Sequence, residues 1–224
     1  MGPLATVDFL YQIIAATPAG CDQDHIPLIV HQVPQIADRS QAILEGTDLP
    51  FMPMLEGLRR LSAAGCDFAT IPCNSAHHWY ERLSNEQPLK ILHIVDSVVM
   101  ALEQCAVAPG CGTLAVLGTR GLHYSGVYRR RLQDLYTLSP DSEAVQCLVD
   151  GAVHAVKAGQ LERGTLLAEQ AVSQSLEGGA DIVLLACTEL PLVLRDRPIM
   201  PACIDSTATL ALLSIEESRR ASIS

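Results

Sequence analysis

The feature that most constrains this chain is a short internal repeat whose two copies, residues 65–77 and 179–191, lie 114 positions apart without a gap. In each copy a helical pattern stops at glycine, an apolar run follows, and a cysteine closes the run, at Cys73 and at Cys187. A helix that ends at glycine before a short apolar run is typical of a parallel sheet, whose functional residues follow the carboxyl end of each strand. The repeat therefore predicts two similar halves that each present one thiol.

Length, composition and charge narrow the class of protein. The 224 residues are 49% hydrophobic and 18% charged, which allows one large domain or two small ones around a packed core. No apolar run reaches the roughly 18 to 20 residues of a membrane span, and the first residues lack the pattern of a signal peptide. We therefore expect a cytoplasmic protein. A formal charge of -10 argues against nucleic acid or an anionic membrane as a partner.

The eight cysteines carry no sign of a metal or redox site. In a reducing compartment they are expected to be free thiols, and no pair has the Cys-x-x-Cys spacing of zinc or disulfide chemistry. Most of them then act as small core residues. The cysteine spacing therefore predicts no zinc or redox site.

Strand and helix patterns alternate along the whole chain. Strands are expected at 25–30, before Cys73, at 91–95, at 114–117, before Cys187 and at 200–204. Helices are expected near the first residues (apolar Val7, Leu10, Tyr11 and Ile14), after Pro53, after Ser75, through Tyr128 and Leu132, at 145–159 and at 161–178. This alternation predicts an α/β fold with two similar domains, each a parallel sheet flanked by helices, related by a pseudo-twofold axis.

The predicted domain boundaries follow from the repeat and from a turn-rich stretch. The first domain is expected over 1–108 and the second over 109–206, with a linker at 109–112 that is rich in proline and glycine. The last segment, 207–224, is expected to pack as a helix on the first domain. Two thiols at equivalent places in two facing domains could then approach one ligand from opposite sides, in the cleft between the domains.

The paired cysteines suggest a chemistry that a single cysteine would not. A lone buried cysteine is most often structural, but Cys73 and Cys187 occupy equivalent places and are followed by hydrogen-bonding residues, Asn74 and Thr188. A helix that begins after each strand favours the thiolate. Two thiols that approach one carbon from opposite faces can remove a proton on one side and return one on the other.

Other catalytic arrangements fit less well. The sequence has no Gly-x-Ser-x-Gly turn, no glycine-rich phosphate loop and no His-Glu-x-x-His motif. His77 and His78 are adjacent, so they point in different directions on a helix. A supporting role behind the thiols and an ordinary structural role are equally good interpretations of His77, and the structural one is stronger for His78.

Several segments together resemble one family. They are 1–6 (Met-Gly-Pro-Leu-Ala-Thr), 24–27 (Asp-His-Ile-Pro), 34–39 (Pro-Gln-Ile-Ala-Asp-Arg), 72–77 (Pro-Cys-Asn-Ser-Ala-His), 117–121 (Leu-Gly-Thr-Arg-Gly), 156–159 (Val-Lys-Ala-Gly) and 186–191 (Ala-Cys-Thr-Glu-Leu-Pro). In this order they resemble the cofactor-independent aspartate/glutamate racemase superfamily, most closely its aspartate racemase branch. The resemblance implies racemisation by a cysteine pair without pyridoxal phosphate or metal, in a homodimer.

The resemblance also assigns roles to residues. It makes Cys73 and Cys187 the catalytic thiols, with Cys73 acting on the D enantiomer and Cys187 on the L. The implied contacts to the α-carboxylate and α-amino groups are Asn74, Ser75, Thr119 and Thr188, and those to the side-chain carboxylate are Arg39 and Lys157. Taken alone, Arg39 is an ordinary loop arginine, and Lys157 an ordinary lysine at a helix end that faces the dipole.

Two departures from the branch pattern leave the substrate open. Leu122 stands where the aspartate branch often has a threonine, and Glu189 stands where glutamate racemases tend to carry a histidine. The preferred hypothesis is interconversion of L- and D-aspartate. The alternatives are a racemase of broader or glutamate specificity, and a catalytically silent amino-acid-binding protein on the same scaffold.

The repeat also predicts that a strand is missing from the first half. In the second half the apolar run 114–117 precedes the turn at Gly118, whereas nothing precedes the corresponding Gly2 turn except Met1. Members of the family that this chain resembles carry an apolar strand and two glycines at this place. We therefore expect that the chain starts late, by roughly 6 to 10 residues on the spacing of the repeat.

Overall fold

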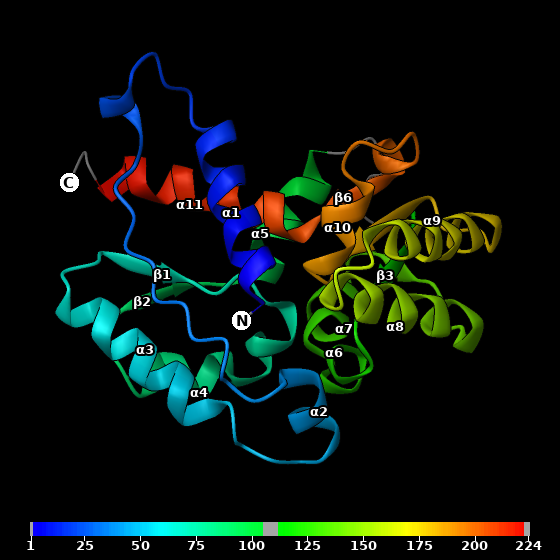
Figure 1. Cartoon of the computed structure of the whole chain (residues 1–224), viewed down its shortest axis with the longest axis horizontal. Helices are drawn as coiled ribbons and strands as arrows, with labels where there is room; N and C mark the ends of the chain where they lie inside the picture. Colours follow the sequence, from blue (N-terminus) through cyan, green and yellow to red (C-terminus); the bar gives the residue numbers. More distant parts are fainter. Residues whose placement is uncertain (1, 105–111, 222–224) are drawn as a thin grey trace.

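The computed structural model describes residues 2–104 and 112–221, and it is a mixed α/β protein with parallel sheets flanked by helices, as the sequence predicts (Figure 1). The first half contains α1 (Pro3–Ala16), η1 (Asp22–Asp24), α2 (Arg39–Leu44), α3 (Phe51–Ala63), β1 (Phe68–Thr70), η2 (Asn74–Trp79), α4 (Tyr80–Asn85), β2 (Lys90–Leu92) and α5 (Ile94–Glu103). The expected linker at 109–112 falls almost wholly outside the described residues.

The second half contains a larger set of strands. Its elements are β3 (Thr113–Leu117), α6 (Arg120–Ser125), α7 (Val127–Leu132), β4 (Thr137–Leu138), α8 (Glu143–Lys157), α9 (Leu161–Glu177), β5 (Ile182–Leu185), α10 (Glu189–Leu194), η3 (Met200–Ala202), β6 (Cys203–Asp205) and α11 (Ser206–Ala221). Gly126, with a φ of 65°, separates α6 from α7, where the sequence predicts one helix. Glycine adopts this left-handed conformation without the steric cost that a Cβ would add.

Both sheets are parallel, but they differ in size. β1 and β2 form a two-stranded parallel sheet, and the other four strands form a parallel sheet in the order β4-β3-β5-β6. Parallel strands bring their carboxyl ends to one edge, so the residues that follow β1 and β5 emerge where the two halves meet.

Three clusters of buried side chains hold these elements together. One lies between β1, β2, α3 and α4, with Leu55 and Trp79 at its centre, and one between the large sheet and helices α8, α9 and α10. The third joins α1, α5 and α11 to the other face of the large sheet. Figure 1 shows α11 beside α1 and α5, so the last helix packs against the first half although it follows the second.

Three of the predicted strands differ from the structure. The strand predicted at 25–30 is absent, and no strand of the described residues pairs with this segment. The strand predicted at 200–204 begins only at Cys203, where pairing with β5 starts, because residues 200–202 form η3. The strand predicted at 91–95 ends at Leu92, because His93 caps α5 by accepting a hydrogen bond from the Val95 N–H on its Nδ1 atom. The two-residue strand β4 is an element that the sequence pattern did not reveal.

The first helix buries a different face from the one its apolar spacing indicates. Val7, Tyr11 and Ile14 are more than half exposed, whereas Phe9 and Ile13 are buried in the core shared with α5 and α11. In the part of the chain that the structure describes, no helix has the length and apolar character needed to cross a membrane.

Candidate active site

The predicted thiols come together in one small cavity between the two halves. Cys73 follows β1 and precedes η2, and Cys187 follows β5 and precedes α10, so equivalent loops deliver the two sulfur atoms. The cavity has a volume of about 30 Å³. Both thiols line it, and so does Glu189. The lining also includes every substrate-binding residue that the resemblance implies: Arg39, Asn74, Ser75, Thr119, Lys157 and Thr188.

Glu189 controls the environment of the second thiol. The Cys187 Sγ donates a hydrogen bond to Glu189 Oε2 at 3.1 Å, and the Thr188 hydroxyl donates to the same oxygen at 3.2 Å. Burial raises the pKa of Cys187 well above its usual value, and the negative charge of Glu189 raises it further. Cys187 is therefore a protonated thiol at neutral pH, which suits the delivery of a proton.

The first thiol faces a cation. Burial alone would lower the pKa of Arg39, but the neighbouring Cys73, Asp38 and Glu189 raise it above its usual value, so the guanidinium stays charged. Its Nη1 donates to the carbonyl oxygens of Ile36 and Ala37 at 3.3 and 3.1 Å. A positive charge therefore lies beside Cys73.

Lys157 reaches the same cavity from the end of α8. Its Nζ lies 3.3 Å from Asp38 Oδ2, and both side chains are nearly half exposed. Burial tends to lower the pKa of Lys157, but Glu189 and Asp38 raise it overall. The pair joins the loop before α2 to the second half, and two cations, Arg39 and Lys157, line the cavity.

Asn74 is fixed by a buried hydrogen-bond network. Its Nδ2 donates to Ser206 Oγ at 3.0 Å, and its Oδ1 accepts a hydrogen bond of 2.6 Å from the Tyr128 hydroxyl. The Ser206 hydroxyl in turn donates to the Leu185 carbonyl, two residues before Cys187. The sequence analysis assigned no site role to Tyr128 or Ser206.

Two further hydrogen bonds connect the halves at the cavity. Ser75 Oγ lies 3.0 Å from Thr119 Oγ1, and Thr119 also caps α6 by accepting from the Leu122 N–H. The Gly121 N–H donates to Ser40 Oγ at 2.9 Å. These contacts hold the loops of both halves against each other.

His77 does not line the cavity. Its Nε2 lies 3.1 Å from the Ile71 carbonyl oxygen and its ring stacks on Tyr80, so it holds the loop that carries Cys73. Burial lowers the pKa of His77 to about 4, which makes it a neutral donor to that carbonyl at pH 7. Among the described residues, no three His, Cys, Asp or Glu side chains are grouped as metal ligands.

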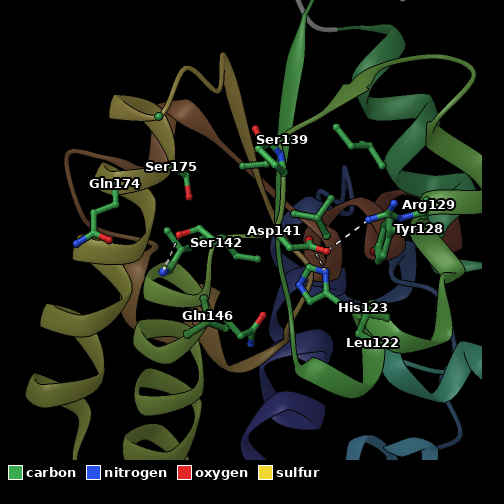
Figure 2. Close-up of a pocket in the computed structure, with 18 of the residues that line it drawn as sticks. Leu122, His123, Tyr128, Arg129, Ser139, Asp141, Ser142, Gln146, Gln174 and Ser175 are labelled. Carbon is green, nitrogen blue, oxygen red and sulfur yellow. Dashed lines mark hydrogen bonds and ion pairs between the residues drawn. The ribbon is translucent and has the colours of Figure 1, made fainter.

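A larger cavity of about 420 Å³ lies elsewhere in the second half, between the large sheet and helices α6 to α9 (Figure 2). Its charged groups bind one another: Asp141 pairs with Arg129 at 3.4 Å and with His123 at 3.6 Å. It contains neither thiol and none of the predicted substrate contacts. The smaller cavity is therefore the candidate active site, because reactive groups of opposite character converge there.

The fold and cavity define a class: a two-domain α/β protein with two thiols and two cations facing a small interdomain cavity. Comparison with known proteins assigns the family, since residues 1–213 match the Asp/Glu/Hydantoin racemase family. The chain therefore belongs to this family of isomerases.

Individual relatives agree with the family. The chain is 27% identical to the broad specificity amino-acid racemase RacX of Bacillus subtilis, over 94% of this chain and 92% of that protein. It is also 27% identical in structure comparison to an aspartate racemase of Picrophilus torridus, with a TM-score of 0.80, covering 97% of this chain and 94% of that one. An aspartate racemase homologue of Pyrococcus horikoshii, 17% identical over 97% and 95% of the two chains, shares the fold with a TM-score of 0.74.

Proposed function

We propose that this protein interconverts L- and D-aspartate without a cofactor, using Cys73 and Cys187 as the two acid–base groups. The observation that carries the proposal is that the two thiols line one cavity in opposite electrostatic settings. Cys73 lies beside the cationic Arg39, and Cys187 donates its proton to the anionic Glu189. In the proposed mechanism Cys73 accepts a proton from the substrate and Cys187 donates one to it.

In the proposed reaction the Cys73 thiolate removes the proton from Cα, leaving an electron pair on that carbon. Cys187 then delivers its own proton to the opposite face, so the products are the inverted amino acid, a Cys73 thiol and a Cys187 thiolate. The reverse direction uses the same groups in exchanged roles. Hydroxyls of Ser75, Thr119 and Thr188 are available to hold the α-carboxylate, where negative charge develops.

Arg39 and Lys157 support an acidic side chain in the substrate. The guanidinium is anchored on one edge by backbone carbonyls, and its buried Nε has no hydrogen-bond partner among the described residues. A carboxylate accepts the paired donors of such an edge, while Lys157 contributes a point charge. The Picrophilus torridus relative is named an aspartate racemase, which favours the same substrate.

Broader specificity is the second candidate, because RacX is named a broad specificity racemase and matches the chain at the same identity. A panel of single enantiomers in heavy water separates the two: aspartate specificity requires Cα exchange and inversion with aspartate and little with neutral amino acids. A binding protein without activity would exchange none. Homodimer formation and a cytoplasmic location stay predictions.

Variants of the two thiols test the mechanism. We expect both Cys73→Ala and Cys187→Ala to lose inversion of aspartate, since each variant lacks one of the two proton carriers. Cys187→Ala should still wash solvent deuterium into D-aspartate through Cys73, and Cys73→Ala into L-aspartate through Cys187. The measurement is Cα exchange by NMR beside optical rotation, with Cys66→Ala, remote from the cavity, as the control. Normal inversion by either active-site variant would exclude the two-thiol mechanism.

A further inference from the structure

The larger cavity of the second half lies where the large sheet is incomplete. β4 pairs only with the first two residues of β3, and the last backbone hydrogen bond between these segments runs from the Ser139 N–H to the Leu114 carbonyl oxygen. On its other side β3 stays paired with β5 as far as Leu117. After β4 the chain turns away through Pro140 into α8. The end of β3 therefore has an open edge on this side, and the cavity of about 420 Å³ lies along it (Figure 2).

Val116 is the residue whose backbone faces the open edge. In a parallel sheet the backbone groups of successive residues point alternately to one neighbouring strand and to the other. The carbonyl oxygens of Thr113 and Leu117 accept hydrogen bonds from the β5 side, and that of Leu114 accepts one from Ser139 on the β4 side. The N–H and C=O of Val116 thus point to the β4 side, where no backbone group of the described residues bonds to them.

The other polar groups of the larger cavity are mostly uncharged. Ser139 Oγ is buried and has no hydrogen-bond partner among the described residues. Figure 2 shows Ser139 beside the sheet, Gln174 and Ser175 on α9, and Gln146 on α8. Apolar side chains of β3, α6 and α8 line the rest. A ligand would therefore meet neutral hydrogen-bonding groups between apolar walls.

The charged groups of this cavity are satisfied without a ligand. Asp141 pairs with Arg129 and lies 3.6 Å from His123 Nδ1. Burial lowers the pKa of His123 more than the neighbouring Asp141 raises it, so the imidazole is neutral at pH 7. Glu177, at the end of α9, is exposed to solvent. Within the described lining no buried charge lacks a partner, which favours an uncharged ligand.

From the open edge and these neutral walls we propose that the larger cavity binds a short, extended peptide without charged groups. A carbonyl of the peptide accepts from the Val116 N–H, and a peptide N–H donates to the Val116 carbonyl. The Ser139 hydroxyl offers a third hydrogen bond. A volume of about 420 Å³ lies within the roughly 300 to 1,000 Å³ of ordinary small-ligand sites.

Two walls of the larger cavity are bonded directly to the active site. Gln146 Nε2 donates to the Gly118 carbonyl oxygen at 3.0 Å, one residue before Thr119. Tyr128 donates to Asn74 Oδ1 at 2.6 Å. A peptide that moves either wall therefore moves a proposed substrate contact, which couples the two sites. This coupling rests on the proposed racemase function, whereas peptide binding does not.

A pair of blocked dipeptides tests the backbone contacts. The probe is N-acetyl-Ala-Leu-amide, and its matched control is the same compound methylated at every amide nitrogen, which keeps the acceptors and side chains but has no N–H donor. Neither compound has the free ammonium and carboxylate of an amino acid. Each is titrated into the full chain, and amide NMR shifts of residues 113–118 are followed. We expect saturable binding of the probe and roughly tenfold weaker binding of the methylated control, since the Val116 carbonyl then loses its donor.

A variant that fills the larger cavity tests the location. Ser175→Phe places a large side chain in the lining, and the lost Ser175 hydroxyl bonds to the Ala171 carbonyl within its own helix. Ser173→Phe is the matched control, on the same helix but outside the lining. We expect Ser175→Phe to weaken probe binding at least tenfold and Ser173→Phe to leave it unchanged. Saturating probe should change kcat/KM for aspartate at least twofold in the parent chain and in Ser173→Phe, but not in Ser175→Phe.

The two parts of the proposal fail separately. Equal binding of both dipeptides, or binding of neither, would overturn the peptide site, and this comparison needs only the parent chain. Retained binding in folded Ser175→Phe would overturn its location. Probe binding without any change in aspartate racemisation would overturn the coupling. A chain that racemises no amino acid would contradict the proposed function, while the titration would still decide the peptide site.

Discussion

At the scale of single residues, charge separates the roles of the two thiols. Cys73 and Cys187 occupy equivalent loops, yet one faces a guanidinium and the other a carboxylate. This asymmetry arises from Arg39 and Glu189, which the repeat does not duplicate: the position equivalent to Glu189 is Ser75. A charged residue present in only one copy thus gives two similar loops different electrostatic surroundings.

Replacing Glu189 by glutamine should lower the pKa of Cys187. The carboxylate disfavours the thiolate, so removing its charge leaves burial as the main cause of the upward shift. The half-point of iodoacetamide labelling of Cys187, followed by peptide mass spectrometry against pH, should move to lower pH. Glu143→Gln is the matched control: the Glu143 hydrogen bond raises the pKa of Cys147, so that variant should shift Cys147 alone. An unchanged Cys187 profile in Glu189→Gln would contradict the assignment.

Arg39→Lys should reduce kcat/KM for aspartate roughly tenfold or more, although the charge is kept, because lysine lacks the paired donors. The steady-state rate with aspartate is compared with that of Arg59→Lys, an exposed arginine on α3 outside the cavity. Lys157→Met should lower kcat/KM for aspartate more than kcat/KM for a neutral amino acid if both cations hold the aspartate side chain. Unaltered aspartate kinetics in both cavity variants would show that the side-chain carboxylate binds elsewhere.

At the scale of elements, a hydrogen-bond network positions the loop that carries Cys73. Tyr128 on α7 donates to Asn74, and Asn74 donates to Ser206 at the start of α11. Burial raises the pKa of Tyr128, so its hydroxyl stays a donor at any working pH. Three elements from distant parts of the chain thereby fix the residue that follows Cys73.

Tyr128→Phe should destabilise the protein by about 1 to 3 kcal/mol, because the buried Asn74 Oδ1 loses its donor. The free energy of unfolding in urea measures the effect. Tyr124→Phe serves as the control, since that side chain is 75% exposed and should tolerate the change. Identical unfolding of the two variants would mean that the network adds nothing to stability.

Local sequence patterns were sufficient to predict some elements and insufficient for others, for physical reasons. Gly65 and Gly179, both with positive φ, end helices before apolar runs, so β1 and β5 were predictable. β4 has only two residues and thus no periodicity to detect. The prediction of the buried face of α1 was wrong because Phe9 and Ile13 pack on helices that are distant in sequence. Only the tertiary structure decides which face of α1 those helices bury.

The candidate site could likewise be predicted only in part from the sequence. Both thiols follow from the repeat, and Arg39 and Lys157 from the resemblance, and the structure brings all four to one cavity. Their roles stay predictions. Tyr128 could not be predicted, because its partner lies 54 positions away and no local pattern marks such a contact.

At the scale of the whole molecule, the two halves are closed on each other. The cavity of about 30 Å³ is far smaller than the roughly 300 Å³ or more of ordinary ligand sites, so an amino acid needs more room than the cavity has in this structure. Ser40 and Gly121 meet where α2 approaches α6. α2 begins at Arg39, so the fit between α2 and α6 also sets the position of the guanidinium.

Gly121→Ala should impair catalysis while leaving the fold intact. A Cβ on Gly121 would lie 2.5 Å from the Ser40 carbonyl oxygen and 2.6 Å from its Cα, so α2 must move away and carry Arg39 with it. A displacement of about 1 Å at such a site can cost on the order of a hundredfold in rate, and we expect kcat/KM for aspartate to fall by at least tenfold.

The control is Gly151→Ala, where the added Cβ meets only the flexible end of Leu167 at 3.1 Å within the helix pair α8 and α9. Both variants should melt within a few degrees of the parent chain, so a loss of activity in Gly121→Ala alone reports closure rather than folding. If Gly121→Ala retains full activity, the contact between Ser40 and Gly121 is not part of the closed, catalytic arrangement. A loss of activity in Gly121→Ala alone would instead mean that the rate depends on how closely the two halves fit as well as on the two thiols, because the cavity is assembled from both halves.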